Sequence, residues 1–358
     1  MPVHGRHRGL RVPYRQSSIL IIMTVKQSWK HKGYVDEPIP AGIDLVKEIR
    51  KMCKDKHAII LAHYYTDKSL QEIADFVGDS LALARQAAKT DAEIIVMCGV
   101  HFMGETNKVL CPDRKCLIPD LNASCSLAES CPAPALKAYK ASHPGYKVIS
   151  YVNTTAAVKA LTDVCVTSSN ASEIVESFPR DAKLIFGPDR NLGAYINAKT
   201  GRHMLLWDGA CIVHERFSVA KIAELKREHP QAKVLAHPEC KGPVLALADK
   251  VGSTAALLKY TMQSDEQEFI VATESGILFE MQRHSPDKHF YPVPPEVTED
   301  SPVGCSCNEC SYMRLNTLEK LYNCLKYEWP EIEIDPEVIR GAVRPINEML
   351  NISAKLGL

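Results

Sequence analysis

The stretch HAIILAHYY, residues 57–65, is an apolar run that ends in polar and aromatic side chains. Two later runs, KVISYVN (147–153) and KVLAHPE (233–239), have the same form. Further short apolar runs and Ala-rich helical segments alternate with them along the chain. Strands of this kind, separated by helices, are typical of parallel sheets that are covered by helices on both faces. The sequence therefore predicts an α/β fold.

The three runs belong to a longer repeat, because their polar ends and the residues that follow them recur at a nearly constant interval. The paired strand-end residues lie 88 and then 86 residues apart: His63 and Tyr65, Tyr151 and Asn153, His237 and Glu239. The hydroxyl residues that follow have the same two steps: Ser80, Ser168 and Thr254. One cysteine per unit follows with steps of 86 and 99 residues: Cys125, Cys211 and Cys310. We infer three copies of one unit, the third with an insertion of about a dozen residues around 283–304.

In parallel α/β sheets, ligand-binding groups gather outside the carboxyl ends of the strands. Three αβα sandwich domains related by pseudo-threefold symmetry would therefore direct the recurring residues into one central active-site cavity. We expect the repeats over residues 37–125, 126–211 and 212–310. Residues 311–358 are expected to form two closing helices, the second beginning at Asp335-Pro336.

The first 35 residues differ from the rest in composition, with seven Lys or Arg up to Lys32 and no acidic residue before Asp36. An Arg-rich, acid-poor segment is compatible with a transit peptide. We favour a disordered tail over residues 1–36, or a start assigned upstream of the true one, with Met23 as the candidate start.

The overall composition excludes several classes of function. The 358 residues carry 43 basic and 43 acidic side chains, so there is no excess charge for a nucleic-acid surface or a polybasic membrane patch. No apolar run reaches the roughly 18 residues that a membrane-spanning helix needs. Thirteen cysteines, an odd number in a long chain, indicate a reducing compartment. We expect a soluble cytoplasmic protein, with Cys53, Cys98, Cys165 and Cys324 as buried core residues.

Three cysteines around one cavity suit a metal centre. Structural zinc usually takes four ligands at short spacing, and only CSCNEC (305–310) contains closely spaced cysteines. A 4Fe–4S cluster with three cysteine ligands fits better, and its open iron would act as a Lewis acid. In this interpretation Cys305 and Cys307 are spare thiols, and their spacing leaves open whether they are redox-active.

The strand-end residues suit acid–base chemistry on a small anion. His237 and Glu239 flank Pro238, so both side chains can project to the same side of an extended segment. Such a pair, like Tyr65 with His63, can exchange protons with a ligand. The three hydroxyl residues lie near expected helix starts, where free N–H groups favour anions.

Long blocks of this sequence resemble the quinolinate synthase family from about residue 40 to the C-terminus. These blocks are LAHYYT, GDSLALAR, CGVHFMGET, LIPDLNASCSLAESCP, YVNTTAAVKALTDVCVTSSNA, DGACIVHE, AHPEC, GST and CNECSYMRLNTLEKL. The resemblance implies three αβα domains around a 4Fe–4S cluster. It also implies a transferase-type condensing enzyme of NAD biosynthesis, which forms quinolinate, phosphate and water from iminoaspartate and dihydroxyacetone phosphate. A functional link to L-aspartate oxidase follows from the same resemblance.

Carried over residue by residue, the resemblance implies the following site. The cluster ligands would be Cys125, Cys211 and Cys310. The catalytic residues would be Tyr65, His237 and Glu239. The residues lining the substrate site would be His63, Ser80, Tyr151, Asn153, Ser168, His214 and Thr254. Some members of the family carry CxxCxxC near the third ligand, whereas this chain has CxCxxC, so a regulatory disulfide is not carried over.

Two other functions remain open from the residues alone. An iron–sulfur redox or sensor protein would explain the thiols but leave the hydroxyls, His237 and Glu239 without a role. An aconitase-like hydratase also uses a three-cysteine cluster with an open iron. Release of phosphate from the substrates would separate the synthase from both.

Overall fold

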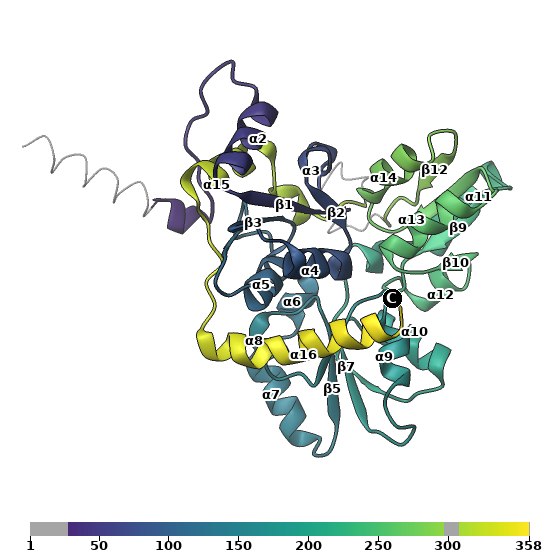
Figure 1. Ribbon diagram of the computed structural model, residues 1–358. Coiled ribbons are helices and arrows are strands. Elements are labelled where there is room, and N and C mark those ends of the chain that lie inside the picture. Colours follow the sequence, from purple (N-terminus) through teal and green to yellow (C-terminus); the bar gives the residue numbers. More distant parts are fainter. Residues whose placement is uncertain (1–27, 297–307, 358) are drawn as a thin grey trace, which may run out of the picture.

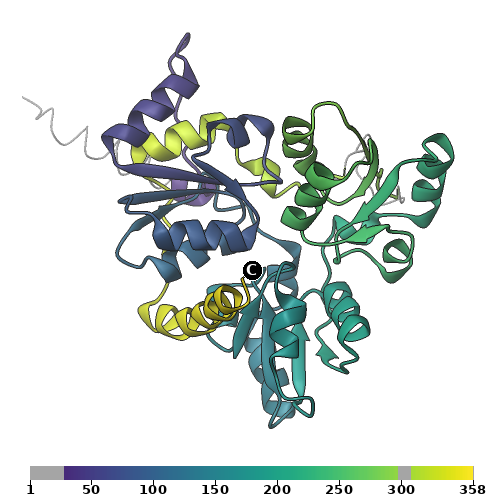
Figure 2. The ribbon, with the colours of Figure 1, turned by 45° about the vertical axis from the view of Figure 1, so that its right-hand side comes forward.

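The computed structural model describes residues 28–296 and 308–357 (Figure 1). It contains three four-stranded sheets with helices packed on their faces, and every strand pair in the sheets is parallel. The predicted α/β class and the three αβα units are confirmed. Figure 2 shows the three units as separate lobes around a common centre.

Each sheet lies within one of the expected repeats. The first unit contains β1 (Ala58–His63), β2 (Phe76–Gly78), β3 (Ile94–Cys98), β4 (Lys115–Leu117), α2 (Leu45–Asp55), α3 (Lys68–Ile73), α4 (Ser80–Lys89) and α5 (His101–Leu110). The second contains α6 (Ser126–Ser130), α7 (Ala133–Ser142), β5 (Lys147–Tyr151), α8 (Ala156–Lys159), β6 (Val164–Val166), α9 (Ala171–Glu176), β7 (Leu184–Gly187), α10 (Arg190–Thr200) and β8 (Leu205–Leu206). The third contains η1 (His214–Arg216), α11 (Val219–Glu228), β9 (Lys233–Ala236), α12 (Gly242–Leu245), β10 (Lys250–Val251), α13 (Thr254–Gln263), β11 (Glu268–Ala272), α14 (Ile277–His284) and β12 (His289–Pro292).

The strand order is the same in all three sheets. It runs β2-β1-β3-β4, β6-β5-β7-β8 and β10-β9-β11-β12, so the first strand of each unit is interior and lies beside the third. The order therefore reverses between the first and the third strand, and in open parallel sheets ligands bind outside the carboxyl ends at such a point. These ends belong to the strands that carry the recurring polar residues.

A second set of recurring residues supports the repeat at the opposite end of the sheets. In each unit an aspartate next to the second strand accepts a hydrogen bond from a backbone N–H of the first strand. The three bonds are Ile60 N to Asp75 (2.7 Å), Val148 N to Asp163 (2.9 Å) and Val234 N to Asp249 (2.7 Å). The aspartates are again 88 and 86 residues apart, so the repeat extends through the whole length of the sheets.

The expected closing helices are present after η2 (Met313–Leu315). α15 (Leu318–Tyr327) packs on α2 of the first unit, and α16 (Pro336–Lys355) lies along α8 and β6 of the second while also contacting α5. Asp335 caps α16 by accepting a hydrogen bond from Glu337 N, as the Asp-Pro signal predicts. In Figure 2 the yellow α16 lies beside both the first and the second lobe.

The prediction of a disordered tail is wrong for residues 28–36. Residues 28–32 are helical, and Trp29 is only 6% exposed. Its ring lies 5.0 Å from that of Tyr327, and its Nε1 donates a hydrogen bond to Glu37. A large aromatic side chain buried against α15 holds this segment on the first unit. Residues 1–27, including Met23, lie outside the described residues.

The sequence missed four short strands, β2, β8, β10 and β12, each at the edge of its sheet. β2 lies between α3 and α4, within a stretch whose composition is otherwise typical of helix. β12 lies inside 283–304, where the insertion was expected, so the extra residues of the third unit fall between Pro292 and Cys310. Edge strands of two to four residues carry too little periodicity to be recognised.

The four cysteines assigned to the core, Cys53, Cys98, Cys165 and Cys324, are all buried. Within the described residues, no helix is both long and apolar enough to cross a membrane.

Gly341 allows α16 to approach the second unit closely, which leads to a test of that packing. A Cβ at this position would lie 2.8 Å from the Cβ and 3.3 Å from the Cα of Ala160, and neither atom can move by side-chain rotation. Overpacking typically costs about 1–3 kcal/mol, against about 1 kcal/mol gained in helix propensity. We expect Gly341→Ala to lower the free energy of unfolding by up to about 2 kcal/mol, measured by chemical denaturation.

The matched control is Gly242→Ala, because nothing lies within 4 Å of a Cβ at Gly242. We expect it to change the free energy of unfolding by less than about 0.5 kcal/mol. Equal effects of the two substitutions would contradict close packing of α16.

Candidate active site

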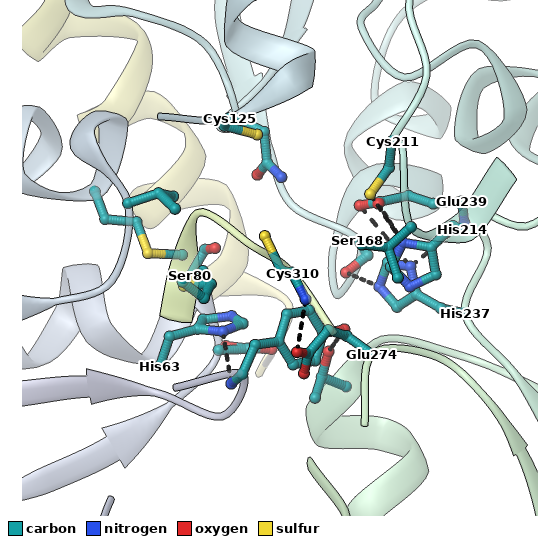
Figure 3. A pocket seen from close by; sticks show the side chains of 18 of the residues that line it. His63, Ser80, Cys125, Ser168, Cys211, His214, His237, Glu239, Glu274 and Cys310 are labelled. Atoms are coloured by element: carbon teal, nitrogen blue, oxygen red, sulfur yellow. Dashed lines mark hydrogen bonds and ion pairs between the residues drawn. The ribbon is translucent and has the colours of Figure 1, made fainter. Parts of the chain in front are cut away.

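All thirteen predicted site residues line one cavity, and Figure 3 labels nine of them. They come from all three units: His63, Tyr65, Ser80, Cys125, Tyr151, Asn153, Ser168, Cys211, His214, His237, Glu239, Thr254 and Cys310. The structure places these residues together, and their individual roles remain predictions. The sequence missed other lining residues, among them Asp79 and Glu274.

The first strand of each unit delivers two of these side chains. His63 and Tyr151 are the last residues of β1 and β5, and His237 directly follows β9. The second member of each pair lies two residues further on. Because the three strands end at the same cavity, the units contribute equivalent backbone positions with different side chains.

Two of the three hydroxyl residues occupy helix starts without capping them, whereas Ser168 lies in the turn before α9, two residues before its N-cap Asn170. Ser80 and Thr254 are the first residues of α4 and α13, and the side chains that accept the capping hydrogen bonds are Asp79 and Ser253. The hydroxyls are therefore available for other contacts. Thr254 Oγ1 lies 2.8 Å from Tyr65 Oη, and both helices present free N–H groups next to the cavity.

Glu239 is the centre of a buried hydrogen-bond network and is only 3% exposed. One carboxylate oxygen accepts a 2.6 Å hydrogen bond from Tyr151 Oη, and the other lies 2.9 Å from His214 Nδ1. His237 Nδ1 is 3.8 Å from the carboxylate, so the pair expected to flank Pro238 does project to one side. Burial raises the pKa of Glu239, but His237, His214 and the hydrogen bond from Tyr151 outweigh it, so the pKa lies below its usual range.

Burial holds two histidines and two tyrosines of the cavity, His63, His237, Tyr65 and Tyr151, in their neutral forms. Burial lowers the pKa of both His63 and His237 to about 3. Burial also raises the pKa values of Tyr65 and Tyr151 well above the ordinary phenol value. Near neutral pH the site therefore combines phenol donors and neutral imidazoles with an ionised carboxylate.

Thr273, which the sequence did not single out, links two of these groups. Its hydroxyl lies 2.9 Å from Tyr65 Oη and 2.9 Å from His214 Nε2. A chain of hydrogen bonds therefore runs from Tyr65 through Thr273 and His214 to Glu239. Its position near the end of the apolar run EFIVATE (268–274) could have marked it, together with Glu274, as a candidate residue of the cavity.

Lys159 is completely buried and fixes the turn that carries Tyr151 and Asn153. Its ammonium donates to the backbone carbonyls of Val152, at 2.8 Å, and Thr154. Asn153 Oδ1 is buried beside the cavity without a hydrogen-bond partner among the described residues. An acceptor in this state is suited to a ligand that brings a donor.

Each of the three cysteines precedes a short helical turn. Cys125 immediately precedes α6, whereas Cys211 and Cys310 lie three residues before η1 and η2. Burial raises the pKa of Cys125 to about 12 and that of Cys310 to about 11, and it raises the pKa of Cys211 as well. Backbone N–H groups partly oppose this by donating to each sulfur: those of Leu127 and Ala128, of His214, and of Tyr312 and Met313.

Figure 3 shows the sulfur atoms of Cys125, Cys211 and Cys310 on different sides of the same space. The three thiols are half-buried and have raised pKa values, so they need a metal to favour their ionised form, and thiolates select iron–sulfur clusters. Cys211, His214 and Glu239 also hold ligand atoms within 4.8 Å of one another, which would suit a single ion. Cys305 and Cys307 lie outside the described residues.

Among the described residues that line the cavity there is no lysine or arginine. An anion in the cavity would therefore meet hydroxyls, neutral histidines, helix N-termini and any bound metal, without a basic side chain.

Comparisons with known proteins identify the family of this chain. The profile of the family described as NadA, quinolinate synthetase A protein, matches residues 47–351. The chain is 53% identical to the quinolinate synthase of Synechococcus sp. over 311 residues, which is 87% of this chain and 96% of that protein. The quinolinate synthases of Thermosynechococcus vestitus and Chloroherpeton thalassium are also 53% identical, over 88% and 87% of this chain and 97% and 95% of their own lengths.

The matched segment contains all three sheets and all thirteen cavity residues. The chain belongs to the quinolinate synthetase A family.

Proposed function

We propose that this protein is a quinolinate synthase, a condensing enzyme of the transferase class. It joins iminoaspartate and dihydroxyacetone phosphate to form quinolinate, phosphate and water. Its family membership makes it an enzyme of NAD biosynthesis. The observation that carries the proposal is one buried cavity in which three thiols meet proton donors and acceptors from all three units.

The cofactor that we propose is a 4Fe–4S cluster held by Cys125, Cys211 and Cys310. The donor set fits it, because the three thiols come from three separate loops and leave a fourth position open. A single ion on Cys211, His214 and Glu239 is less consistent, because His214 and Glu239 already pair with each other and with Thr273 and Tyr151. When bound, the cluster supplies an open iron that acts as a Lewis acid towards an oxygen of the substrates.

The substrates are small anions, one a dicarboxylate and the other a phosphate ester. The chain would hold them with the N-termini of α4 and α13, where Ser80 and Thr254 begin the helices, and with Ser168. Asn153 adds an amide whose buried oxygen has no partner within the described chain. Burial excludes water and strengthens each of these contacts.

The condensation requires several proton transfers, because a C–C bond and a C=N bond form while phosphate and hydroxide leave. Glu239 is ionised and can accept a proton from a substrate carbon or nitrogen within reach. Tyr65 is a neutral phenol and can donate, and its bonds to Thr273 and Thr254 orient the hydroxyl. His63 and His237 are neutral and can act in either direction. The atoms of substrates and products balance without an oxidant when two molecules of water are released, one as the C=N bond forms and one as hydroxide leaves.

The sensor and hydratase alternatives have less support. A sensor would not need the buried network around Glu239, and the family match covers proteins named as synthases.

The direct test is product formation by protein purified without oxygen. We expect quinolinate and phosphate to appear when iminoaspartate and dihydroxyacetone phosphate are supplied together, and activity to be lost after exposure to air because an open cluster is oxygen-labile. Quinolinate is measured by chromatography and phosphate by a colorimetric assay. A preparation with a full complement of iron and sulfide that forms neither product would rule the proposal out.

We expect Cys125→Ser to lose the cluster and the activity together, because a serine oxygen is a much poorer ligand for iron–sulfur clusters than a thiolate. The measurements are iron, acid-labile sulfide and quinolinate formation after anaerobic reconstitution. Cys131→Ser is the matched control, since Cys131 is buried at the end of α6, away from the cavity lining. An active Cys125→Ser variant without iron would contradict the ligand assignment.

We expect Glu239→Gln to keep the cluster but to lower kcat by about 10²- to 10⁴-fold, because the amide cannot act as a base. Glu268→Gln is the control, since Glu268 begins β11 at the opposite end of that sheet and is partly exposed. Iron content and steady-state kinetics are measured for both variants. Unchanged kcat in Glu239→Gln would remove Glu239 from the proton-transfer steps.

A further inference from the structure

Two buried carboxylates hold the backbone of two of the three cavity cysteines. Asp189 Oδ2 accepts a 2.9 Å hydrogen bond from Cys211 N, and Glu274 Oε1 accepts a 3.0 Å hydrogen bond from Cys310 N. The two carboxylate residues are 0% and 1% exposed. The bonds connect segments that are 22 and 36 residues apart in the sequence.

Asp189 and Glu274 occupy equivalent positions in their units. Asp189 lies two residues after β7, and Glu274 lies two residues after β11. The registers agree, because Ser150 pairs with Gly187 and Ala236 pairs with Ala272, each at the carboxyl end of its strand. The two carboxylates are therefore one feature of the repeat.

The first unit has Val100 at this position, two residues after Cys98, which pairs with Ala62. It uses another buried carboxylate, Asp120, which is 1% exposed and lies five residues before Cys125. Asp120 accepts a 2.8 Å hydrogen bond from Asn122 N and pairs with Lys320 of α15. The loop of Cys125 is thus held through its own turn and a closing helix.

The remaining acceptor sites of the two carboxylates are also occupied by backbone N–H groups. Asp189 Oδ1 accepts from Asn191 N at 2.7 Å and Leu192 N at 2.9 Å. Glu274 Oε2 accepts from Gly276 N at 2.7 Å. Each carboxylate therefore joins the rigid end of a central strand, the start of the following segment and the cysteine. Both its oxygens accept hydrogen bonds, while burial raises the pKa of Asp189 and that of Glu274 to about 8.

We propose that Asp189 and Glu274 are positioning residues that fix Cys211 and Cys310 as ligands of the metal cluster. This inference rests on the proposed function, because it assumes that these cysteines hold a cluster. The backbone N–H of each cysteine is held by a carboxylate, and Cys211 Sγ also lies 3.2 Å from His214 Nδ1. Loss of the carboxylate leaves a buried N–H without a partner and frees the loop to move. Partners of this kind, which orient metal ligands, typically contribute 10- to 100-fold to metal affinity.

The variants Asp189→Asn and Glu274→Gln test the inference with almost no change of volume. An amide nitrogen cannot accept a hydrogen bond. In each variant, therefore, either the cysteine N–H or the N–H groups bonded to the other oxygen lose their acceptor. The control is Asp163→Asn, because Asp163 also accepts a backbone hydrogen bond, from Val148 N, but does so at the far end of β5. All proteins are reconstituted anaerobically, and iron, acid-labile sulfide and the rate of iron loss to a chelator are measured.

We expect Asp189→Asn and Glu274→Gln to lose iron to the chelator about 10- to 100-fold faster than the wild type. Asp163→Asn should lose iron at the wild-type rate. The unfolding midpoints of the cluster-free proteins separate this effect from general instability. If both cavity variants retain iron as the wild type and Asp163→Asn do, the inference is overturned while the proposed function stands. A reconstituted wild type without sulfide would instead overturn the proposed cofactor, and the inference with it.

A second measurement does not require the variants to fold. Backbone hydrogen exchange in the cluster-free wild type should show protection at the N–H groups of Cys211 and Cys310, because the carboxylates hold them before any metal binds. Exchange at both positions as fast as in an open loop would overturn the inference even if the variants proved insoluble.

Discussion

The cavity depends on hydrogen bonds that cross all three boundaries between the units. Ser169 donates to Asp79 at 2.8 Å between the first and second units, and Tyr151 donates to Glu239 at 2.6 Å between the second and third. Gln71 donates to the carbonyl of Gly276 at 3.1 Å between the third and first. A buried polar group that loses its partner costs about 1–3 kcal/mol, so each boundary resists being opened alone. The three sheet ends face one another because all three boundaries are closed.

Some of these bonds are structural and chemical at once. The bond between Tyr151 and Glu239 joins two units and also helps to keep the carboxylate ionised in a buried site. The stability of the assembly and the protonation state of the cavity are therefore coupled. A substitution at a boundary between units would therefore alter the protonation of the cavity even if it contacts no ligand, because the same hydrogen bonds join the units and set that protonation.

Much of this site could be predicted from the sequence, because the site residues recur at matching positions of the three units. Strand ends, hydroxyls and cysteines recur at 88- and 86-residue steps, and a parallel sheet turns that recurrence into a common location. What could not be predicted depends on partners that no local pattern marks. Asp189 and Glu274 look like ordinary strand ends, since their partners are backbone N–H groups 22 and 36 residues away. Trp29 was set aside with its segment because the composition of residues 1–36 carries no sign of the α15 surface that buries it.

The chemical capacity of the cavity comes from the differences among the three units. Tyr65, Asn153 and Glu239 occupy equivalent positions and provide a proton donor, a group that does not titrate and a proton acceptor. Their surroundings widen these differences: burial raises the pKa of Tyr65, whereas His237, His214 and the hydrogen bond from Tyr151 hold the pKa of Glu239 low despite its burial. Three identical side chains at this position would repel one another or leave one function missing. The shared fold thus supplies the geometry, and the divergence of the repeats supplies an acid and a base within one water-excluded space.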